Sequence, residues 1–242
     1  MFGHLFGYGY GGYYSGYYSY MIYILPAFLL AMLAQMNVTR TFNKYSNMFS
    51  LRGLTGAQVA RRILDQNGLY SVGIEQIQGK LSDHYDPKAK VVRLSMPVYN
   101  STSVASIGVA AHETGHAVQH SVGYAPLKLR NAIIPVTQFS SSISIWLVIL
   151  GLLVSFSPLA YVGIALFSFA VLFQLVTLPV EFNASARALK TLEVSNMLYD
   201  AELRDAKKVL RAAALTYVAA TVVAFAQLFR LLAMVNGGSR RN

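Results

Sequence analysis

Residues 112–116, near the middle of the chain, read His-Glu-Thr-Gly-His and have the spacing of a metal site. The surrounding residues 103–120 contain no proline and carry apolar residues at helical spacing, so we expect them to form a helix. Residues four apart lie on one face of a helix, so the imidazoles of His112 and His116 can point at one ion. Glu113 lies on the adjacent face, where its carboxylate can reach a water molecule beside the ion. This HExxH pattern predicts two metal-ligating histidines and a general base.

The composition limits both the kind of metal site and the kind of protein. The 242 residues include no cysteine, which excludes disulfides, iron–sulfur clusters and thiolate zinc sites, so any metal must be held by histidine and carboxylate. The hydrophobic fraction is 55% and the charged fraction is 12%, and the apolar residues gather in long runs, as in membrane proteins. The net charge of +10 comes from basic residues between these runs, which fits membrane topology better than a nucleic-acid-binding face.

Four apolar runs predict a mostly α-helical membrane protein with four transmembrane helices. The first, residues 20–36, is about the minimum length for a span and contains Pro26, which can kink a membrane helix without breaking it. The second and third lie within residues 132–180 and are separated only by Ser157-Pro158, so we expect a helical hairpin. Residues 212–235 form the fourth run.

Two tails and two polar segments make up the rest of the chain. Residues 1–19 are rich in glycine and tyrosine and carry no formal charge, so we expect a tail, and residues 236–242 form a second, short one. The polar segments are residues 37–131 and 181–211, the second of which has a helical pattern. We expect the two polar segments to fold together into one α+β domain.

Local patterns predict further elements of this domain. Thr55 is a typical N-cap for a helix over residues 57–64, and Asn67-Gly68 should end that helix. Residues 72–77 and 90–95 have the β-branched character of strands.

Topology indicates which residue completes the metal site. The two polar segments are separated by two crossings, so they share one side of the membrane. They hold eleven and six of the 20 Lys and Arg residues, so the positive-inside rule places both in the cytoplasm. A catalytic zinc needs a third protein ligand and an open position for water. Glu181, which follows the third span directly and lies on the same side as His112, meets this requirement.

Other residues are weaker candidates for the third ligand. Three acidic residues lie in a charged stretch that more often faces water: Glu193, Asp200 and Glu202. His120 shares a helical face with His116, but a straight helix carries it about 6 Å farther along the axis. We interpret His120 as a helix C-terminal residue favoured by the helix dipole, and Ser101 or Ser103 as the N-cap of the same helix.

Several segments resemble the YugP-like bacterial membrane zinc metallopeptidases, in order and over nearly all of the chain after the first tail. They are Leu81–Pro87, Val92–Ser95, Ser103–Gln119 and Leu178–Ala188. The resemblance implies a bacterial plasma-membrane protein with a zincin-like fold, Zn²⁺ as cofactor, and kinship with gluzincin peptidases of the HtpX and CAAX-protease kind. Those relatives follow HExxH with a Glu-x-x-Ala-Asp helix whose glutamate is the third zinc ligand.

Two roles follow from this resemblance. Glu181 matches the ligating glutamate, and Ser185 stands where the relatives carry an aspartate that orients a zinc-bound histidine. A serine hydroxyl can make one hydrogen bond to a histidine there but brings no charge.

The expected activity is a zinc-dependent endopeptidase that cleaves membrane-associated proteins near the cytoplasmic face. Glu113 would take a proton from the attacking water and pass it to the leaving amine. Candidate donors to the oxyanion are His84, Tyr85 and Arg187. Residues 90–95 are either the edge strand onto which an extended substrate pairs or an ordinary strand of the sheet.

The expected partners are a peptide or membrane-protein substrate and the lipid bilayer, together with a membrane protein complex or a second copy of the chain, but not nucleic acid. One alternative is a catalytically silent scaffold with structural zinc, which a fourth protein ligand such as His120 or His84 would favour. A second alternative is a metal transporter, which the scarcity of ionisable residues in the spans disfavours.

Overall fold

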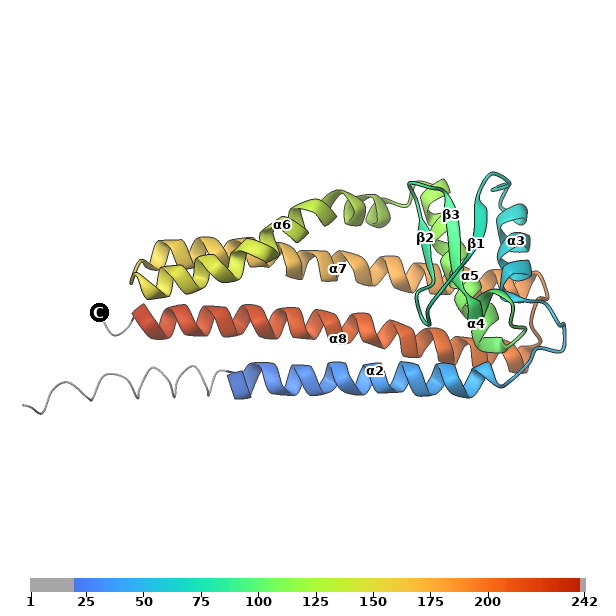
Figure 1. The fold of residues 1–242 in the computed structure, drawn as a ribbon, viewed down its shortest axis with the longest axis horizontal. Helices are drawn as coiled ribbons and strands as arrows, with labels where there is room; N and C mark the ends of the chain where they lie inside the picture. The colour runs from blue at the N-terminus through green and yellow to red at the C-terminus, as the bar shows by residue number, and fades with distance from the viewer. Residues whose placement is uncertain (1–19, 240–242) are drawn as a thin grey trace, which may run out of the picture. The chain divides into compact units, whose positions relative to one another are not determined.

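The computed structural model describes residues 20–239, so the predicted tail at 1–19 and the last three residues of the second tail lie outside the described part. Within this part the protein is mostly helical, as predicted, and four helices are long and apolar enough to cross a membrane (Figure 1). A π-helical turn, η1 (Tyr20–Ile24), leads into the first of them. The four helices are α2 (Leu25–Ser46), α6 (Ala125–Leu153), α7 (Ser157–Val194) and α8 (Asp200–Ser239).

These helices are longer than the apolar runs that predicted them. α2 continues ten residues beyond the predicted end of the first span, at residue 36. The predicted polar segment 181–211 is not one separate helix: its first part is the end of α7 and its second part is the start of α8. Asn196 adopts a φ of 49° just after α7, a left-handed conformation that asparagine tolerates, and this residue breaks the segment in two.

The described residues form two compact units. One consists of Met1–Leu33, Arg130–Val176 and Tyr217–Asn242, as far as these ranges are described. In this unit α6, α7 and α8 share a buried apolar cluster that includes Val148, Phe167 and Leu231. α6 and α7 approach each other closely, because a Cβ atom on Gly163 would lie 2.6 Å from the carbonyl oxygen of Ser144. Small residues at such a contact are typical of helix packing in membranes.

The second unit consists of Ala34–Leu129 and Thr177–Thr216 and contains all the residues of the predicted HExxH site. Its shorter elements are α3 (Gly56–Gln66), β1 (Gly73–Ile77), β2 (His84–Asp86), β3 (Val91–Ser95), α4 (Met96–Tyr99) and α5 (Val104–Ser121). Thr55 caps α3 through a reciprocal capping box with Gln58, and the hydroxyl of Ser103 caps α5, so the predicted N-caps are confirmed.

The sheet has the strand order β1-β3-β2, with β1 parallel and β2 antiparallel to β3. β3 is therefore the central strand, so of the two alternatives for residues 90–95 the structure supports an ordinary strand of the sheet and not a substrate-pairing edge. β2 has only three residues and gave no recognisable strand pattern. One face of the sheet carries a polar ladder in which Arg93 donates to Glu75 and Asp86, and the other buries Val92 and Leu94.

α5 lies behind this sheet in the view of Figure 1. It is the most buried helix or strand of the unit. Fourteen of its 18 residues are buried. Ala105, Ala110 and Ala117 pack into a core shared with α3 and the sheet, while Ile107 and Ala111 pack into a second core shared with α7 and α8. The HExxH helix is thus held on two sides by separate apolar clusters, which fixes the direction of its polar side chains.

Candidate metal centre

The side chains of His112, His116 and Glu181 converge in the second unit. Nε2 of His112 lies 3.3 Å and Nε2 of His116 lies 3.6 Å from Oε2 of Glu181. The two imidazole rings are nearly perpendicular, at 82°, with centroids 4.8 Å apart. α5 supplies both histidines because they are one helical turn apart, and α7 supplies the carboxylate from 65 or more residues later in the chain.

These distances fit a zinc ion. Zinc binds histidine nitrogen and carboxylate oxygen at about 2.0–2.2 Å in tetrahedral geometry, so its ligand atoms should lie about 3.4 Å from one another. The two histidine-to-glutamate distances are 3.3 and 3.6 Å, and all three candidate ligand atoms lie within 4.8 Å of each other. Two imidazoles and one carboxylate also form a donor set typical of catalytic zinc, which leaves one position open for water.

The candidate metal ligands lie in a buried and negatively charged environment. His116 is 9%, Glu113 9% and Glu181 3% exposed. Burial lowers the pKa of His116, but the hydrogen bond to Glu181, the negative charges of Glu113 and Glu181 and the hydrogen bond to Gln119 together hold this pKa above its usual range. Two carboxylates therefore create a negative field around the imidazoles, which favours a bound cation.

Each histidine has a hydrogen-bond partner on its second ring nitrogen. Nδ1 of His112 lies 3.1 Å from the hydroxyl of Ser185, the residue that the resemblance assigned to this position. Nδ1 of His116 lies 3.0 Å from Oε1 of Gln119, which the sequence analysis did not single out. The spacing of three residues on one helix could have suggested Gln119, because residues i and i+3 are neighbours.

The candidate oxyanion donors His84 and Tyr85 lie on opposite faces of β2, because successive strand residues alternate. Tyr85 faces α5, where its hydroxyl lies 2.9 Å from Nδ1 of His120. Burial, followed by the charge of Asp86, raises the pKa of the Tyr85 hydroxyl, so it keeps its proton. His84 is exposed and its Nδ1 lies 2.8 Å from the carbonyl oxygen of Ser82.

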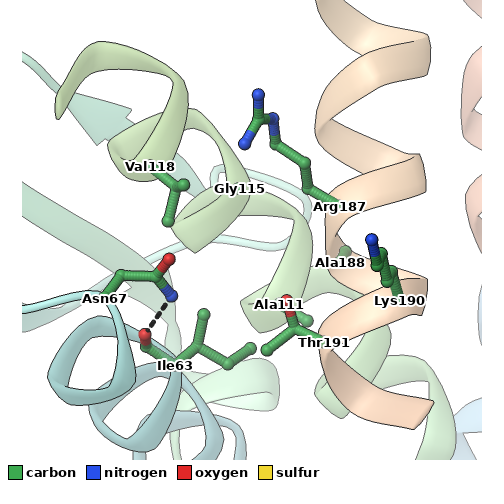
Figure 2. Close-up of a pocket in the computed structure, with 9 residues that line it drawn as sticks. All are labelled: Ile63, Asn67, Ala111, Gly115, Val118, Arg187, Ala188, Lys190 and Thr191. Atoms are coloured by element: carbon green, nitrogen blue, oxygen red, sulfur yellow. Dashed lines mark hydrogen bonds between the residues drawn. The ribbon is translucent and has the colours of Figure 1, made fainter. Parts of the chain in front are cut away.

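Arg187 lines a pocket of about 120 Å³ between α3, α5 and α7 (Figure 2). The pocket residues are Ile63, Asn67, Ala111, Gly115, Val118, Arg187, Ala188, Lys190 and Thr191. Figure 2 shows Arg187 and Lys190 extending from α7, with Ile63 of α3 and Asn67, the C-cap of α3, across the pocket. None of the three candidate metal ligands is among the lining residues. The guanidinium of Arg187 donates through Nε to Oδ1 of Asn183 at 2.8 Å.

The weaker ligand candidates have other surroundings. Glu193 and Asp200 are exposed. The carboxylate of Glu202 accepts hydrogen bonds from the hydroxyl of Ser50 and the backbone N–H of Leu51. Among residues 20–239, the group with convergent metal-ligand atoms is His112, His116 and Glu181.

Comparison with known proteins agrees with this geometry. Residues 20–236 match the model of a family described as "Putative neutral zinc metallopeptidase". The chain is also 48% identical over 209 residues to "Putative membrane protease YugP" of Bacillus subtilis (strain 168), a similarity that covers 86% of this chain and 93% of that protein. No solved structure matches the chain. The match over most of the sequence shows that the chain belongs to this zinc metallopeptidase family of YugP-like membrane proteins.

Proposed function

We propose that the protein is a zinc-dependent endopeptidase that cleaves membrane-associated proteins near the cytoplasmic face of the bilayer. The observation that carries the proposal is the convergence of His112, His116 and Glu181 at separations that fit tetrahedral zinc. Family membership supports the peptidase class, and the four apolar helices support a multi-pass membrane protein.

His112, His116 and Glu181 would hold the metal. When bound, zinc supplies a Lewis acid that acidifies a water molecule and polarises the scissile carbonyl. The carboxylate of Glu113, on the adjacent face of α5, accepts a proton from the attacking water and donates it to the leaving amine. Because Glu113 is largely buried, its carboxylate has few competing interactions with solvent.

Among the three proposed oxyanion donors we favour Tyr85. Its hydroxyl is on the α5 side of the sheet, is paired with His120 and keeps its proton because its pKa is raised. β2, which carries Tyr85, pairs with β3 and has no second partner strand among the described residues. An extended substrate pairing with the free side of β2 would place its backbone beside Tyr85.

The sequence of α7 supports the membrane-associated substrate class. The apolar run of this helix ends at Val180, and Glu181 is the next residue. A metal ligand at the end of an apolar helix suits segments that emerge from the bilayer. The basic residues of both polar segments support a cytoplasmic position for the site.

The test compares the wild type with Glu113→Gln in nanodiscs, with a fluorogenic unfolded protein and with whole-membrane proteomics. We expect cleavage to fall by a factor of at least about 100 while zinc content stays at one ion per chain, because glutamine cannot accept the proton. Glu193→Gln, at an exposed site on α7, is the matched control and should leave cleavage unchanged. Equal cleavage by wild type and Glu113→Gln would refute the mechanism.

A further inference from the structure

Gln119 is a fully buried polar side chain at the contact between α5 and α7, with an exposed fraction of 0%. Its amide has three partners. Nε2 donates to the carbonyl oxygen of Val180 at 2.8 Å and to Oδ1 of Asn183 at 3.0 Å, and Oε1 lies 3.0 Å from Nδ1 of His116. A buried amide with this many partners has a single favourable orientation.

The donor and acceptor roles of the Gln119 and Asn183 amides can be assigned by starting from Arg187. An arginine side chain can only donate, so the Asn183 atom that receives Nε of Arg187 at 2.8 Å must be the amide oxygen. The Gln119 atom facing the same oxygen must then be the amide nitrogen. The carbonyl oxygen of Val180, which can only accept, independently requires a nitrogen at the same place.

The orientation of the Gln119 amide in turn decides which ring nitrogen of neutral His116 carries the hydrogen. With its nitrogen directed at α7, Gln119 presents its oxygen to Nδ1 of His116, and that ring nitrogen must carry a hydrogen. The lone pair of the neutral imidazole then lies on Nε2, the atom that faces Glu181. His112 lacks this constraint, because its Nδ1 faces the hydroxyl of Ser185, which can donate or accept.

We propose that Gln119 is a positioning residue that holds His116 in the tautomer that ligates metal through Nε2, with Asn183 and Arg187 fixing the orientation of its amide. This proposal rests on the proposed function, because it requires that His112, His116 and Glu181 bind zinc. Gln119 acts through His116 and also joins α5 to the backbone of Val180, one residue before Glu181. The same side chain therefore sets the tautomer of one ligand and the distance to another.

The test is the zinc dissociation constant of the purified protein, measured by competition with a chromophoric chelator, together with the melting temperature of the zinc-free protein. Outer-shell partners of zinc histidines typically contribute 10- to 100-fold in metal affinity. We expect Gln119→Leu, which has a similar volume but no hydrogen bonds, to bind zinc 10- to 100-fold more weakly than the wild type. Unchanged zinc affinity in this variant would overturn the proposal.

A matched pair at Asn183 keeps the test decisive if Gln119→Leu does not fold. Asn183→Asp preserves an acceptor for both Gln119 and Arg187, so its zinc affinity should stay within about threefold of the wild type. Asn183→Leu removes the acceptor but leaves the Val180 carbonyl, so its affinity should fall by an intermediate factor. Equal zinc affinity of the two Asn183 variants would contradict the role given to Asn183 and Arg187, because the Val180 carbonyl alone would then orient the Gln119 amide.

Thr114→Val separates positioning from general stability. Thr114 is fully buried on α5, and its hydroxyl donates only to the carbonyl oxygens of Ala110 and Ala111 in the same helix. This variant should lower the melting temperature without changing zinc affinity, and a loss as large as that of Gln119→Leu would assign Gln119 a merely structural role. If the wild type itself binds no zinc, the proposed function fails. If the wild type binds zinc and Gln119→Leu binds it with the same affinity, the positioning role fails and the proposed function stands.

Discussion

Gly115 of α5 contacts the backbone of Ala184 of α7 so closely that a Cβ atom at residue 115 would lie 2.7 Å from the Ala184 carbonyl oxygen. This contact lies beside the candidate metal centre, because Gly115 immediately precedes His116 and Ala184 is three residues after Glu181. The absence of a side chain at Gly115 allows the two helices to approach until the carboxylate reaches both imidazoles.

Gly115→Ala should therefore separate α5 from α7 and weaken the metal centre. A real Cβ atom cannot lie this close to a backbone oxygen, so we expect a loss of about 1–3 kcal/mol in stability and at least about tenfold weaker zinc binding. Gly108→Ala is the control on the same helix, because its Cβ would lie an ordinary 3.6 Å from Ala206. If both variants bind zinc as the wild type does, the close approach has no part in forming the site.

Glu181→Gln should abolish stoichiometric zinc binding while the protein remains folded. Glutamine keeps the size of the side chain but replaces an anionic ligand with a neutral amide, which zinc binds poorly. Because outer-shell changes already weaken zinc sites 10- to 100-fold, the loss of a ligand should exceed about 100-fold. Metal analysis of the purified variant measures this, and Glu193→Gln on the exposed face of α7 should retain full zinc content.

Tyr85→Phe should lower kcat and leave zinc affinity unchanged. The hydroxyl of Tyr85 is the proposed donor to the oxyanion, and the removal of one such donor typically costs about 10²–10³ in kcat. His84→Ala changes the neighbouring residue on the opposite face of β2 and should have little effect. A larger loss of kcat in His84→Ala than in Tyr85→Phe would reverse this assignment.

The acid stability of the sheet should depend on Asp86. Hydrogen bonds from the backbone N–H of Ala89 and from Arg93 lower the pKa of this carboxyl from 3.8 to about 2. A lowered pKa in the folded state stabilises the fold above pH 3.8, and that contribution disappears as the pH falls from about 3.8 to about 2. Asp86→Asn should thus be less stable than the wild type at pH 6, and most of this difference should be lost at pH 2. Thermal melts of both proteins measure the difference, and a gap that is the same at both pH values would contradict the assignment.

The absence of cysteine offers a direct test of sidedness. Tyr70, in the second unit, is 75% exposed, and Phe156, between α6 and α7, is 55% exposed. With a membrane-impermeant maleimide, Phe156→Cys should react in intact spheroplasts, and Tyr70→Cys should react only after the membrane is permeabilised. The reverse pattern would place the metal centre outside the cytoplasm.

Elements defined by local patterns were predictable from the sequence. The apolar runs predicted four long helices, and the Thr55 and Ser103 caps predicted where α3 and α5 begin, because capping involves residues only three apart. Two features of the sheet were not predicted, because they depend on more than a local pattern. β2 is too short to show alternation, and the central position of β3 depends on pairing with strands on both sides.

For the candidate metal centre, the sequence by itself determined that His112 and His116 share a helical face, since a spacing of four residues fixes this in any helix. It also limited the ligands to histidine and carboxylate, because there is no cysteine. Only the tertiary structure decided that Oε2 of Glu181 lies within 3.6 Å of both imidazoles. Likewise, only helix packing showed that Gln119 connects His116 to α7. The physical reason is that helical periodicity acts over a few residues, whereas contacts between residues 60 or more positions apart depend on how two buried helices pack.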